Sequence, residues 1–313
     1  MRMNDFARRP LRLGLVGVGK IARDSHFPAL AASDDFDLVA TASHDGSIED
    51  VPAFRTIEAM IAATELDAVS LCTPPFSRLD VAEAAFSAGL HVMLEKPPAA
   101  TLGGIAAISA AADHHRRTLY ASWHSRKAAG VGPAAEWCRT RKIRSVKIRW
   151  HENIRKWHPG QEWIMAAGGF GVFDPAINAL SILTTILPGD IVVRSAQLTY
   201  PENCAAPIAA KAQMQSGKTA IDASCDFLQE GEQTWTIAVD ADHGRLLLTE
   251  GGAKLFIDDS PLTLDAIGEY PALYRDFAAL IASSESLVDV APLRLVADML
   301  LIADRETTSK FIF

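Results

Sequence analysis

Apolar and polar positions along the first 125 residues follow a pattern that predicts strands alternating with helices. Short apolar runs indicate buried strands over residues 11–16, 36–42, 67–72, 91–94 and 119–123. Helices are expected between them, over residues 57–64, 78–89 and 102–115. Strands that alternate with helices at this spacing favour a doubly wound parallel sheet with right-handed crossovers.

After about residue 125 the pattern becomes typical of an antiparallel sheet. Val146, Ile148 and Trp150 alternate with Lys147 and Arg149, as in a strand with one buried face. Further strands are expected over residues 195–200, 208–215, 219–227, 233–239 and 244–249, and helices over 131–139, 270–283 and 292–304. We therefore expect an α/β protein with a doubly wound parallel domain over residues 1–125. Residues 126–313 are expected to form a second, α+β domain with a large, mostly antiparallel open sheet.

A glycine-rich turn directly follows the first predicted strand. Its pattern, Gly17-x-Gly19-x-x-Ala22, is the dinucleotide-binding fingerprint with alanine in the third place. Glycines let the backbone come close to a ligand, and the following helix offers unpaired N–H groups to a phosphate. The first domain is therefore predicted to be an NAD(P)-binding Rossmann domain, with Gly17, Gly19, Lys20 and Ile21 at the cofactor.

The end of the second strand bears on the choice between NAD and NADP. An acidic residue here binds the ribose hydroxyls of NAD, whereas a cation accommodates the 2′-phosphate of NADP. Ser43 can donate to a phosphate and His44 can stack on adenine, but Asp45 comes two positions later than the usual acid. Both cofactors therefore remain open, with Ser43 and His44 as candidate contacts.

Polar residues also follow the next three strands, as Thr73-Pro74, Glu95-Lys96-Pro97 and Trp123-His124. The carboxyl ends of parallel strands lie at one edge of the sheet, which is where ligands bind. Pro97 disfavours a helical conformation at Lys96 and restricts how its side chain leaves the strand. Thr73, Pro74, Glu95 and Lys96 are therefore predicted to contact the cofactor.

Imidazoles, a carboxylate and indoles gather within residues 150–160, just beyond a predicted strand. An indole can pack on the C–H face of a sugar, whose hydroxyls need convergent donors and acceptors. Trp157-His158 therefore indicates a pocket of this kind. The spacing of His151 and His158 does not fit a metal site, and no third ligand follows.

A second polar pair follows the glycine-rich residues 168–171. Asp174 precedes a proline, which is the pattern of a helix that begins with a carboxylate N-cap. In such a helix Asn178 lies one turn later on the same face. The two side chains form a candidate catalytic pair, and the glycines before them would let another molecule come close.

Charge and cysteine content exclude several classes of partner. The net charge of −8 at pH 7 repels nucleic acid and anionic membranes. A basic run over residues 139–156 is explained by a solvated strand face, because no nucleic-acid motif accompanies it. No apolar run approaches the roughly 20 residues of a membrane span. Four cysteines without close pairing indicate a reducing compartment, so we expect a cytoplasmic protein without nucleic-acid or membrane partners.

Together these motifs resemble the glucose-fructose oxidoreductase and inositol dehydrogenase (Gfo/Idh/MocA) family. The resemblance rests on the glycine turn 17–22, Cys72-Thr73-Pro74-Pro75, Glu95-Lys96-Pro97-Pro98 and Asp174-x-x-x-Asn178. Within the family, Trp123-His124-Ser125-Arg126 and residues 155–161 are similar to bacterial D-galactose and L-arabinose 1-dehydrogenases. The resemblance runs over nearly the whole chain.

The resemblance implies oxidation of an aldose, D-galactose or L-arabinose, at C1 to the sugar lactone, with the hydride passing to NAD or NADP. The broad family commonly has a histidine where this chain has Asn178, and an amide cannot accept a proton at neutral pH. Asp174 is therefore the expected base for the anomeric hydroxyl, with Asn178 orienting that hydroxyl. Lys96 would polarise it or relay the proton, and is the alternative base.

The resemblance also implies contacts to the sugar from His124, Glu152 and His158, with Trp235 as a pocket wall beside Trp157. A non-catalytic protein that senses a sugar or NAD(P) on the same fold is the alternative function, and the retained Lys96 and Asp174 count against it. An antiparallel sheet with one uncovered face often pairs with a second copy, so a homodimer through that face is the candidate assembly.

Overall fold

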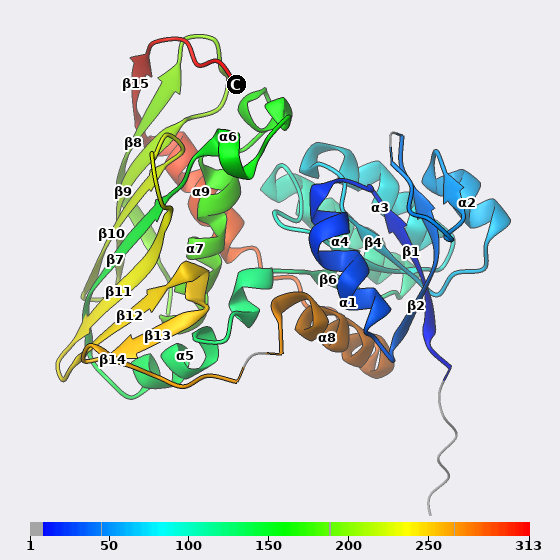
Figure 1. The fold of residues 1–313 in the computed structure, drawn as a ribbon, viewed down its shortest axis with the longest axis horizontal. Helices are drawn as coiled ribbons and strands as arrows, with labels where there is room; N and C mark the ends of the chain where they lie inside the picture. Colours follow the sequence, from blue (N-terminus) through cyan, green and yellow to red (C-terminus); the bar gives the residue numbers. More distant parts are fainter. Residues whose placement is uncertain (1–8, 45, 188, 266) are drawn as a thin grey trace, which may run out of the picture. The chain divides into compact units, whose positions relative to one another are not determined.

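The computed structural model describes residues 9–44, 46–187, 189–265 and 267–313, and its contacts divide them into two units (Figure 1). The first unit contains the residues up to Ala99, Gly103–Ser122 and Tyr270–Val288, and the second contains Ala100–Leu102, Trp123–Glu269 and Asp289–Phe313. Tyr270–Val288, which the sequence assigns to the second domain, thus belongs to the first unit. The boundary at residue 125 stays a prediction.

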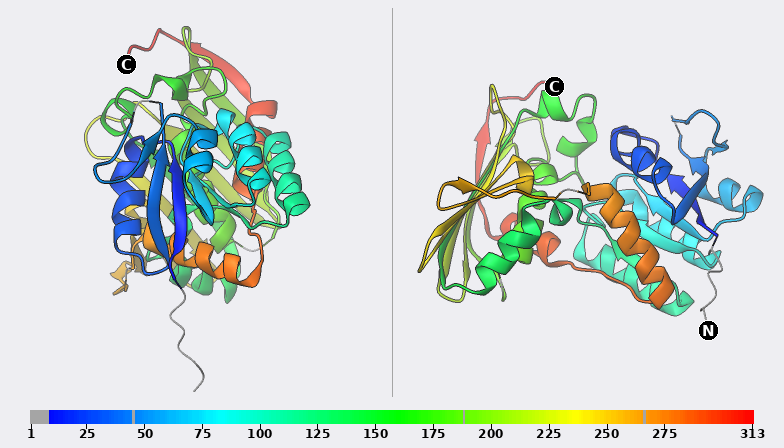
Figure 2. Two further views of the ribbon diagram at one scale, coloured as in Figure 1. Left: turned by 90° about the vertical axis from the view of Figure 1, so that its right-hand side faces the viewer. Right: turned by 60° about the horizontal axis from the view of Figure 1, so that its bottom comes forward.

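The first unit is a parallel sheet with helices on both faces (Figure 2). Over the described residues it has six strands in the order β3-β2-β1-β4-β5-β6, and every pair is parallel. The predicted doubly wound fold is confirmed. The strands are β1 Leu11–Val16, β2 Phe36–Ala42, β3 Ala53–Phe54, β4 Ala68–Leu71, β5 His91–Leu94 and β6 Leu119–Ala121. The helices are η1 Ala22–His26, α1 Phe27–Ala31, α2 Ile57–Ala63, η2 Pro75–Ser77, α3 Arg78–Ser87, α4 Leu102–His115 and α8 Glu269–Ser283.

Helices α1 and α8 bring aromatic side chains onto β1 in the core of the first unit. Leu13 and Leu15 of β1 pack in one cluster with Phe27 of α1 and with Tyr274 and Phe277 of α8. The helix after the glycine turn begins as a π-helical turn, η1, before it continues as α1. Single π-helical turns are frequent at functional sites, and this one ends in a histidine that is buried in the core.

The second unit is built on a larger mixed sheet. Among the described residues it has nine strands in the order β14-β13-β12-β11-β7-β10-β9-β8-β15. In the described part of this sheet only the pairs β7–β10 and β8–β15 are parallel, so the prediction of a mostly antiparallel sheet is confirmed. Three of its strands, β13, β14 and β15, are not predicted by the sequence patterns. The strands are β7 Ile143–His151, β8 Val192–Pro201, β9 Ala209–Ser216, β10 Thr219–Asp226, β11 Thr234–Ala241, β12 Arg245–Thr249, β13 Lys254–Ile257, β14 Ser260–Pro261 and β15 Asp304–Thr308.

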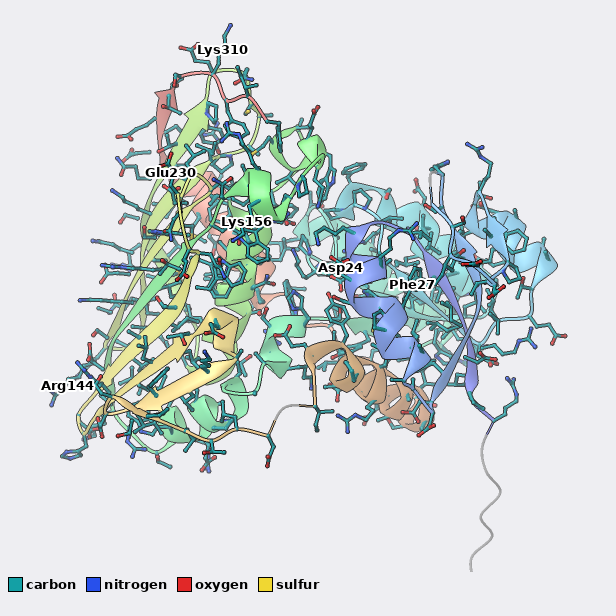
Figure 3. All side chains as sticks on the ribbon, viewed as in Figure 1. Asp24, Phe27, Arg144, Lys156, Glu230 and Lys310 are labelled. Carbon is teal, nitrogen blue, oxygen red and sulfur yellow. The ribbon has the colours of Figure 1, made fainter. Side chains whose placement is uncertain are left out.

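Helices cover one face of this sheet, and the other face is open (Figure 1). The helices of the unit are η3 His124–Lys127, α5 Val131–Arg139, α6 Ile154–Trp157, η4 Glu162–Met165, α7 Phe173–Ile186, η5 Glu250–Gly252 and α9 Ala291–Ile302. Side chains stand out from the open face of the sheet (Figure 3). Lys147 and Arg149 of β7 and Asp222 of β10 are exposed. In the described part of the chain no helix is long and apolar enough to cross a membrane.

The glycines before α7 are needed for the chain to pack on itself. A Cβ at Gly169 would clash with the main-chain oxygens of Trp163 and Ile164, and a Cβ at Gly171 would clash with that of Pro207. The sequence suggested that these glycines let another molecule come close. Instead, other parts of the second unit fill the space beside Gly169 and Gly171.

The predicted N-cap role of Asp174 is wrong. Helix α7 begins at Phe173, with Val172 at the N-cap and no side-chain cap hydrogen bond. Val172 is already in the right-handed helical region, with φ −56° and ψ −19°, because the turn at Gly171 starts the helix earlier than the proline pattern indicates. Asp174 therefore lies inside the first turn of α7.

Two glycines with the same φ allow two effects on stability to be measured separately. One is the strain of a side chain at positive φ, and the other is the clash of a Cβ with its neighbours. Gly171 and Gly217 both have φ +54°, but nothing lies within 4 Å of a Cβ at Gly217. We expect Gly217→Ala to lower the free energy of unfolding by about 1 kcal/mol. Gly171→Ala should lower it by about 3 kcal/mol, because overpacking is added. Urea unfolding followed by circular dichroism measures both, and equal losses would contradict the packing role of Gly171.

Candidate active site

The glycine turn between β1 and η1 has the geometry that the fingerprint requires. Gly17 has φ +96°, and a Cβ there would lie 2.8 Å from the Thr73 nitrogen and 2.9 Å from the Cys72 carbonyl carbon. At Gly19 nothing lies within 4 Å of a Cβ position. The first glycine is thus required by the neighbouring strand end, and the second leaves the backbone open to a ligand.

The ends of β2 and β4 lie next to this turn. Gly17 N donates to Ala42 O at 2.8 Å, and Cys72 N donates to Val16 O at 2.7 Å. The Thr73 hydroxyl oxygen is buried and has no hydrogen-bond partner among the described residues. A buried hydroxyl is rarely left unpaired, so an unpaired one beside an open glycine turn fits a polar ligand such as a dinucleotide.

The other predicted cofactor residues differ in their surroundings. Lys20 is exposed and forms an ion pair with Asp24 one turn along the chain, whereas Ile21 packs partly against the core. Ser43 is half-buried and His44 is exposed, directly after β2. Pro74 precedes η2. Asp45, the late acid, lies outside the described residues.

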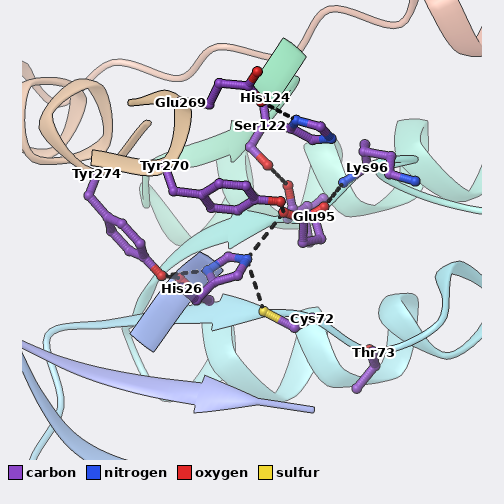
Figure 4. A network of polar contacts seen from close by, with 12 residues as sticks. His26, Cys72, Thr73, Glu95, Lys96, Ser122, His124, Glu269, Tyr270 and Tyr274 are labelled. Atoms are coloured by element: carbon purple, nitrogen blue, oxygen red, sulfur yellow. Dashed lines mark hydrogen bonds and ion pairs between the residues drawn. The ribbon is translucent and has the colours of Figure 1, made fainter. Parts of the chain in front are cut away.

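Lys96 directly follows a buried carboxylate at the end of β5 (Figure 4). The Glu95 residue is only 3% exposed. Its Oε2 accepts a hydrogen bond from the Lys96 backbone N–H at 2.9 Å. Its Oε1 accepts one from the Tyr270 hydroxyl at 2.8 Å and lies 3.1 Å from His26 Nε2. The Glu95 carboxylate therefore points into the core, and its predicted contact with the cofactor stays a prediction.

His26 is the basic partner of this carboxylate. Its Nδ1 lies 2.7 Å from the Tyr274 hydroxyl, and its Nε2 lies 3.4 Å from Cys72 Sγ. Burial by itself lowers the pKa of His26, but its interactions with Cys72, Tyr274 and Glu95 raise that pKa well above its usual value. The stabilisation that this charge provides is present below the unfolded pKa and is lost as the pH rises through the folded pKa.

Arg78, at the start of α3, holds the main chain of the same segment. It is 2% exposed, and its Nε and Nη2 donate to Thr73 O at 2.9 and 2.6 Å. Its Nη1 donates to the carbonyl oxygens of Glu95 and Pro97. A single buried guanidinium thus joins the ends of β4 and β5, at the edge of the sheet where the cofactor residues are predicted.

In the second unit, Glu152, His158 and Asp174 form a polar chain. Glu152 is 2% exposed, and its Oε1 accepts from His158 Nε2 at 2.8 Å while its Oε2 accepts from Trp235 Nε1 at 2.9 Å. His158 Nδ1 lies 3.8 Å from Asp174 Oδ2. One imidazole therefore lies between two carboxylates, of which Glu152 is satisfied on both oxygens.

Local structure explains how these residues meet. Glu152 follows β7, and Asn153 caps the short helix α6 by accepting a hydrogen bond from Arg155 N at 2.9 Å. Helix α6 ends at Trp157, and the backbone N–H of the next residue, His158, donates to Ile154 O at 2.8 Å, so the chain turns back toward Glu152. Trp235 is on β11, which pairs with β7.

Aromatic rings line the same part of the second unit. The Trp157 and Trp235 rings have centroids 4.9 Å apart, and the His158 ring packs edge-on against Phe227 at 5.6 Å. Trp157 and Trp235 are only partly buried, although the Trp235 ring also stacks on the buried Trp150 at 6.0 Å. Indoles beside hydrogen-bonding groups suit a sugar ring.

Asn178 and His124 have other surroundings. Asn178 lies one turn after Asp174 on α7 and is half-buried. His124 Nδ1 lies 2.6 Å from Glu269 Oε2 and 3.3 Å from the Ser125 hydroxyl, not in the Glu152 chain. No group of three or more His, Cys, Asp and Glu residues in the described ranges is placed to hold a metal ion.

The sequence reasoning missed His26, Arg78, Tyr270 and Tyr274. The sequence holds two weak signals for them: a histidine at the end of the fingerprint helix, and an arginine four residues after Pro74. Neither predicts burial, because their partners are distant in the chain: Glu95 is 69 residues from His26 and 175 from Tyr270.

Known proteins match this chain over one or both units. A family model described as an oxidoreductase family with an NAD-binding Rossmann fold, GFO_IDH_MocA, matches residues 11–122. A galactose 1-dehydrogenase of Pseudomonas fluorescens is 42% identical over 305 residues, which is 97% of this chain and 99% of that protein. The crystal structure of a D-galactose-1-dehydrogenase from Rhizobium etli has a TM-score of 0.93 and 47% identity, covering 98% of this chain and 99% of that one.

A more distant structure shares the fold alone. It is a 3-ketoreductase from Actinomadura kijaniata in complex with NADP and TDP-benzene, with a TM-score of 0.82 and 18% identity over 96% of this chain and all of that one. The full-length match at 42% identity and the family model over the first unit agree with each other. The chain belongs to the GFO_IDH_MocA oxidoreductase family, and its first unit is the NAD-binding Rossmann fold of that family.

Proposed function

We propose that this chain is an NAD(P)-dependent aldose 1-dehydrogenase that oxidises D-galactose at C1 to the lactone. The observation that carries the proposal is the chain of Glu152, His158 and Asp174 beside two partly buried tryptophans. The identity to the Pseudomonas fluorescens enzyme, 42% over nearly the full length of both proteins, supports galactose as the substrate. L-Arabinose, which presents much the same ring face, is the second aldose to test.

The sugar is proposed to pack on Trp157 and Trp235 and to bind His158 and His124 through its hydroxyls. Glu152 has a donor on each of its carboxylate oxygens, from His158 and from Trp235. We therefore give Glu152 an indirect role, in which it orients the imidazole and the indole that meet the sugar. This differs from the direct contact to a ring hydroxyl that the resemblance implies.

Asp174 is proposed to accept the proton of the anomeric hydroxyl, while a bound nicotinamide cofactor supplies the hydride acceptor. Asp174 is 5% exposed, so little water competes for its carboxylate. His158 Nδ1 lies 3.8 Å from Asp174 Oδ2, so the imidazole is a neighbour of this carboxylate. Asn178 orients the hydroxyl. Lys96 polarises the oxygen or relays the proton, and is the alternative base.

Two further properties belong to the proposal. The four cysteines are free thiols, which supports a cytoplasmic location. The open face of the second unit carries charges of both signs, Lys147 and Arg149 against Asp222, which supports a homodimer in which this face meets its own copy.

Turnover of D-galactose tests the proposed function directly. Purified protein with D-galactose and NAD or NADP should produce the near-ultraviolet absorbance of the reduced cofactor, and L-arabinose should be oxidised less efficiently or equally well. A matrix of several aldoses against both cofactors settles the preference. Cofactor binding without turnover of any aldose would instead favour the sensor, and salt-sensitive retention on a polyanion would favour a nucleic-acid role.

Chemical rescue distinguishes Asp174 from Lys96 as the base. We expect Asp174→Ala to lower kcat by about 1,000-fold, in the range of a general base, and added formate to restore part of the rate. Lys96→Ala should respond to methylammonium instead. Asp240→Ala, at an exposed acid of the same unit, serves as the control. Normal turnover in Asp174→Ala would remove Asp174 from catalysis, and rescue of Lys96→Ala alone would make Lys96 the base.

Light scattering tests the homodimer. The wild-type protein should have twice the mass of one chain. Ala238→Arg adds a cation beside Lys147, its neighbour across the β7–β11 pair, and should shift the protein to the monomer. Ala282→Arg makes the same change at an exposed site on α8 and should leave the mass unchanged. A wild-type monomer at micromolar concentration would refute this assembly.

A further inference from the structure

The first unit holds a buried polar cluster that the proposed chemistry does not use. Its members come from four parts of the fold: His26 from η1, Cys72 from the end of β4, Glu95 from the end of β5, and Tyr270 and Tyr274 from α8. His26, Glu95, Tyr270 and Tyr274 are all buried, and Tyr270, the most exposed of them, is 7% exposed. Burying this many polar groups costs folding free energy unless they form hydrogen bonds with one another. The contacts within the cluster therefore indicate what it does.

The contacts converge on the main chain of Lys96. Glu95 Oε2 accepts the Lys96 backbone N–H at 2.9 Å, and Oε1 is held by Tyr270 at 2.8 Å and His26 at 3.1 Å (Figure 4). One carboxylate thus bridges the lysine main chain to η1 and α8. If either anchor is lost, the carboxylate has fewer partners and can turn away from Lys96.

Charge explains why a histidine occupies this position. A buried carboxylate needs a compensating charge, and an imidazolium can donate to Glu95 with Nε2 while Nδ1 donates to Tyr274. The titratable groups that face His26 are Cys72 from β4, Glu95 from β5, and Tyr270 and Tyr274 from α8. Together, these neighbours raise the pKa of His26 in spite of its burial.

His26 links the helix after the glycine turn to the segment that follows β5. It is the last residue of η1, which begins directly after the glycine turn. Arg78 holds the carbonyl oxygens of Glu95 and Pro97 independently of the Glu95 side chain. The segment therefore stays attached to the sheet if His26 is changed, and the change acts on the Lys96 amide rather than on the whole loop.

We propose that His26 is a positioning residue for Lys96: by holding the Glu95 carboxylate it fixes the lysine main chain, and it ties that position to the helix of the glycine turn. The role rests on the proposed function of Lys96 in the reaction. His26 touches neither sugar nor hydride in this proposal, and it acts through Glu95.

Hydrogen exchange measures the position of Lys96 without any assay of activity. Pro97 and Pro98 have no N–H, so a peptide over residues 93–99 reports chiefly the amides of Glu95, Lys96 and Ala99. His26→Ala should speed exchange of this peptide by at least about tenfold, the size expected for a hydrogen bond to a charged group. His26→Gln retains an N–H near the position of Nε2 and should give an intermediate rate.

Steady-state kinetics separates positioning from general stability. In His26→Ala, kcat for D-galactose should fall by at least about tenfold while KM for the cofactor changes less than about threefold. Thr118→Val is the matched control, because it alters a buried threonine of the same unit whose hydroxyl has no hydrogen-bond partner among the described residues. It should leave both measurements at wild-type values. Tyr270→Phe removes one donor to Glu95 without a cavity, and repeats the test if His26→Ala fails to fold.

The outcomes distinguish this proposal from the proposed function. Wild-type exchange in His26→Ala and Tyr270→Phe would overturn the positioning role even in an active enzyme. The positioning role would also be overturned if kcat fell across the variants only as far as their melting temperatures fell. If the wild-type protein oxidises no aldose, the proposed function fails, and the exchange rates alone still decide whether His26 holds Lys96.

Discussion

A carboxylate removed from water has to be met by donors on both oxygens, and in the first unit this requirement is met at Glu95. The residue is 3% exposed and follows a central strand, one position before the lysine that the sequence singles out. Its donors come from the lysine main chain, from η1 and from α8. Removing one partner of a buried charged pair typically costs about 3–5 kcal/mol, so these elements are fixed relative to each other around the carboxylate.

The second unit also contains a buried carboxylate with hydrogen-bond donors on both oxygens. Glu152 also directly follows a strand, is 2% exposed and has one donor on each oxygen. Its donors are an imidazole and an indole that the sequence associates with the sugar. In each unit a buried glutamate thus fixes neighbouring groups. Lys96, His158 and Trp235, which are predicted to meet ligands, are more exposed than the glutamate that contacts each of them.

The glycines show that similar sequence patterns can have different structural roles. Gly17 and Gly19 serve the purpose that the fingerprint indicates: one meets the end of β4 and the other leaves open space. Gly169 and Gly171 have the same appearance in the sequence, yet their space is filled by carbonyl groups of Trp163, Ile164 and Pro207. A glycine in such a pattern indicates that other atoms come close to its backbone. Only the folded structure shows whether those atoms belong to a ligand or to another part of the protein.

The sequence by itself determined most elements of the parallel sheet and the glycine turn at its cofactor edge. The helix over residues 102–115 was predicted with the bounds it has in the structure, and five of the six strands of the parallel sheet were predicted, because strand and helix periods depend on neighbours in the chain. The glycine turn and the strand-end residues Thr73 and Lys96 follow from the same local rules.

Only the tertiary structure decided the contacts between distant segments. The partners of Glu95, the pairing of β7 with β10, the place of α8 in the first unit and the addition of β15 to the sheet join residues far apart in the chain. Asp174 lost its predicted cap role because the packing of Gly171 against Pro207 starts α7 earlier. Such contacts depend on the packing of the whole unit, which no local period encodes.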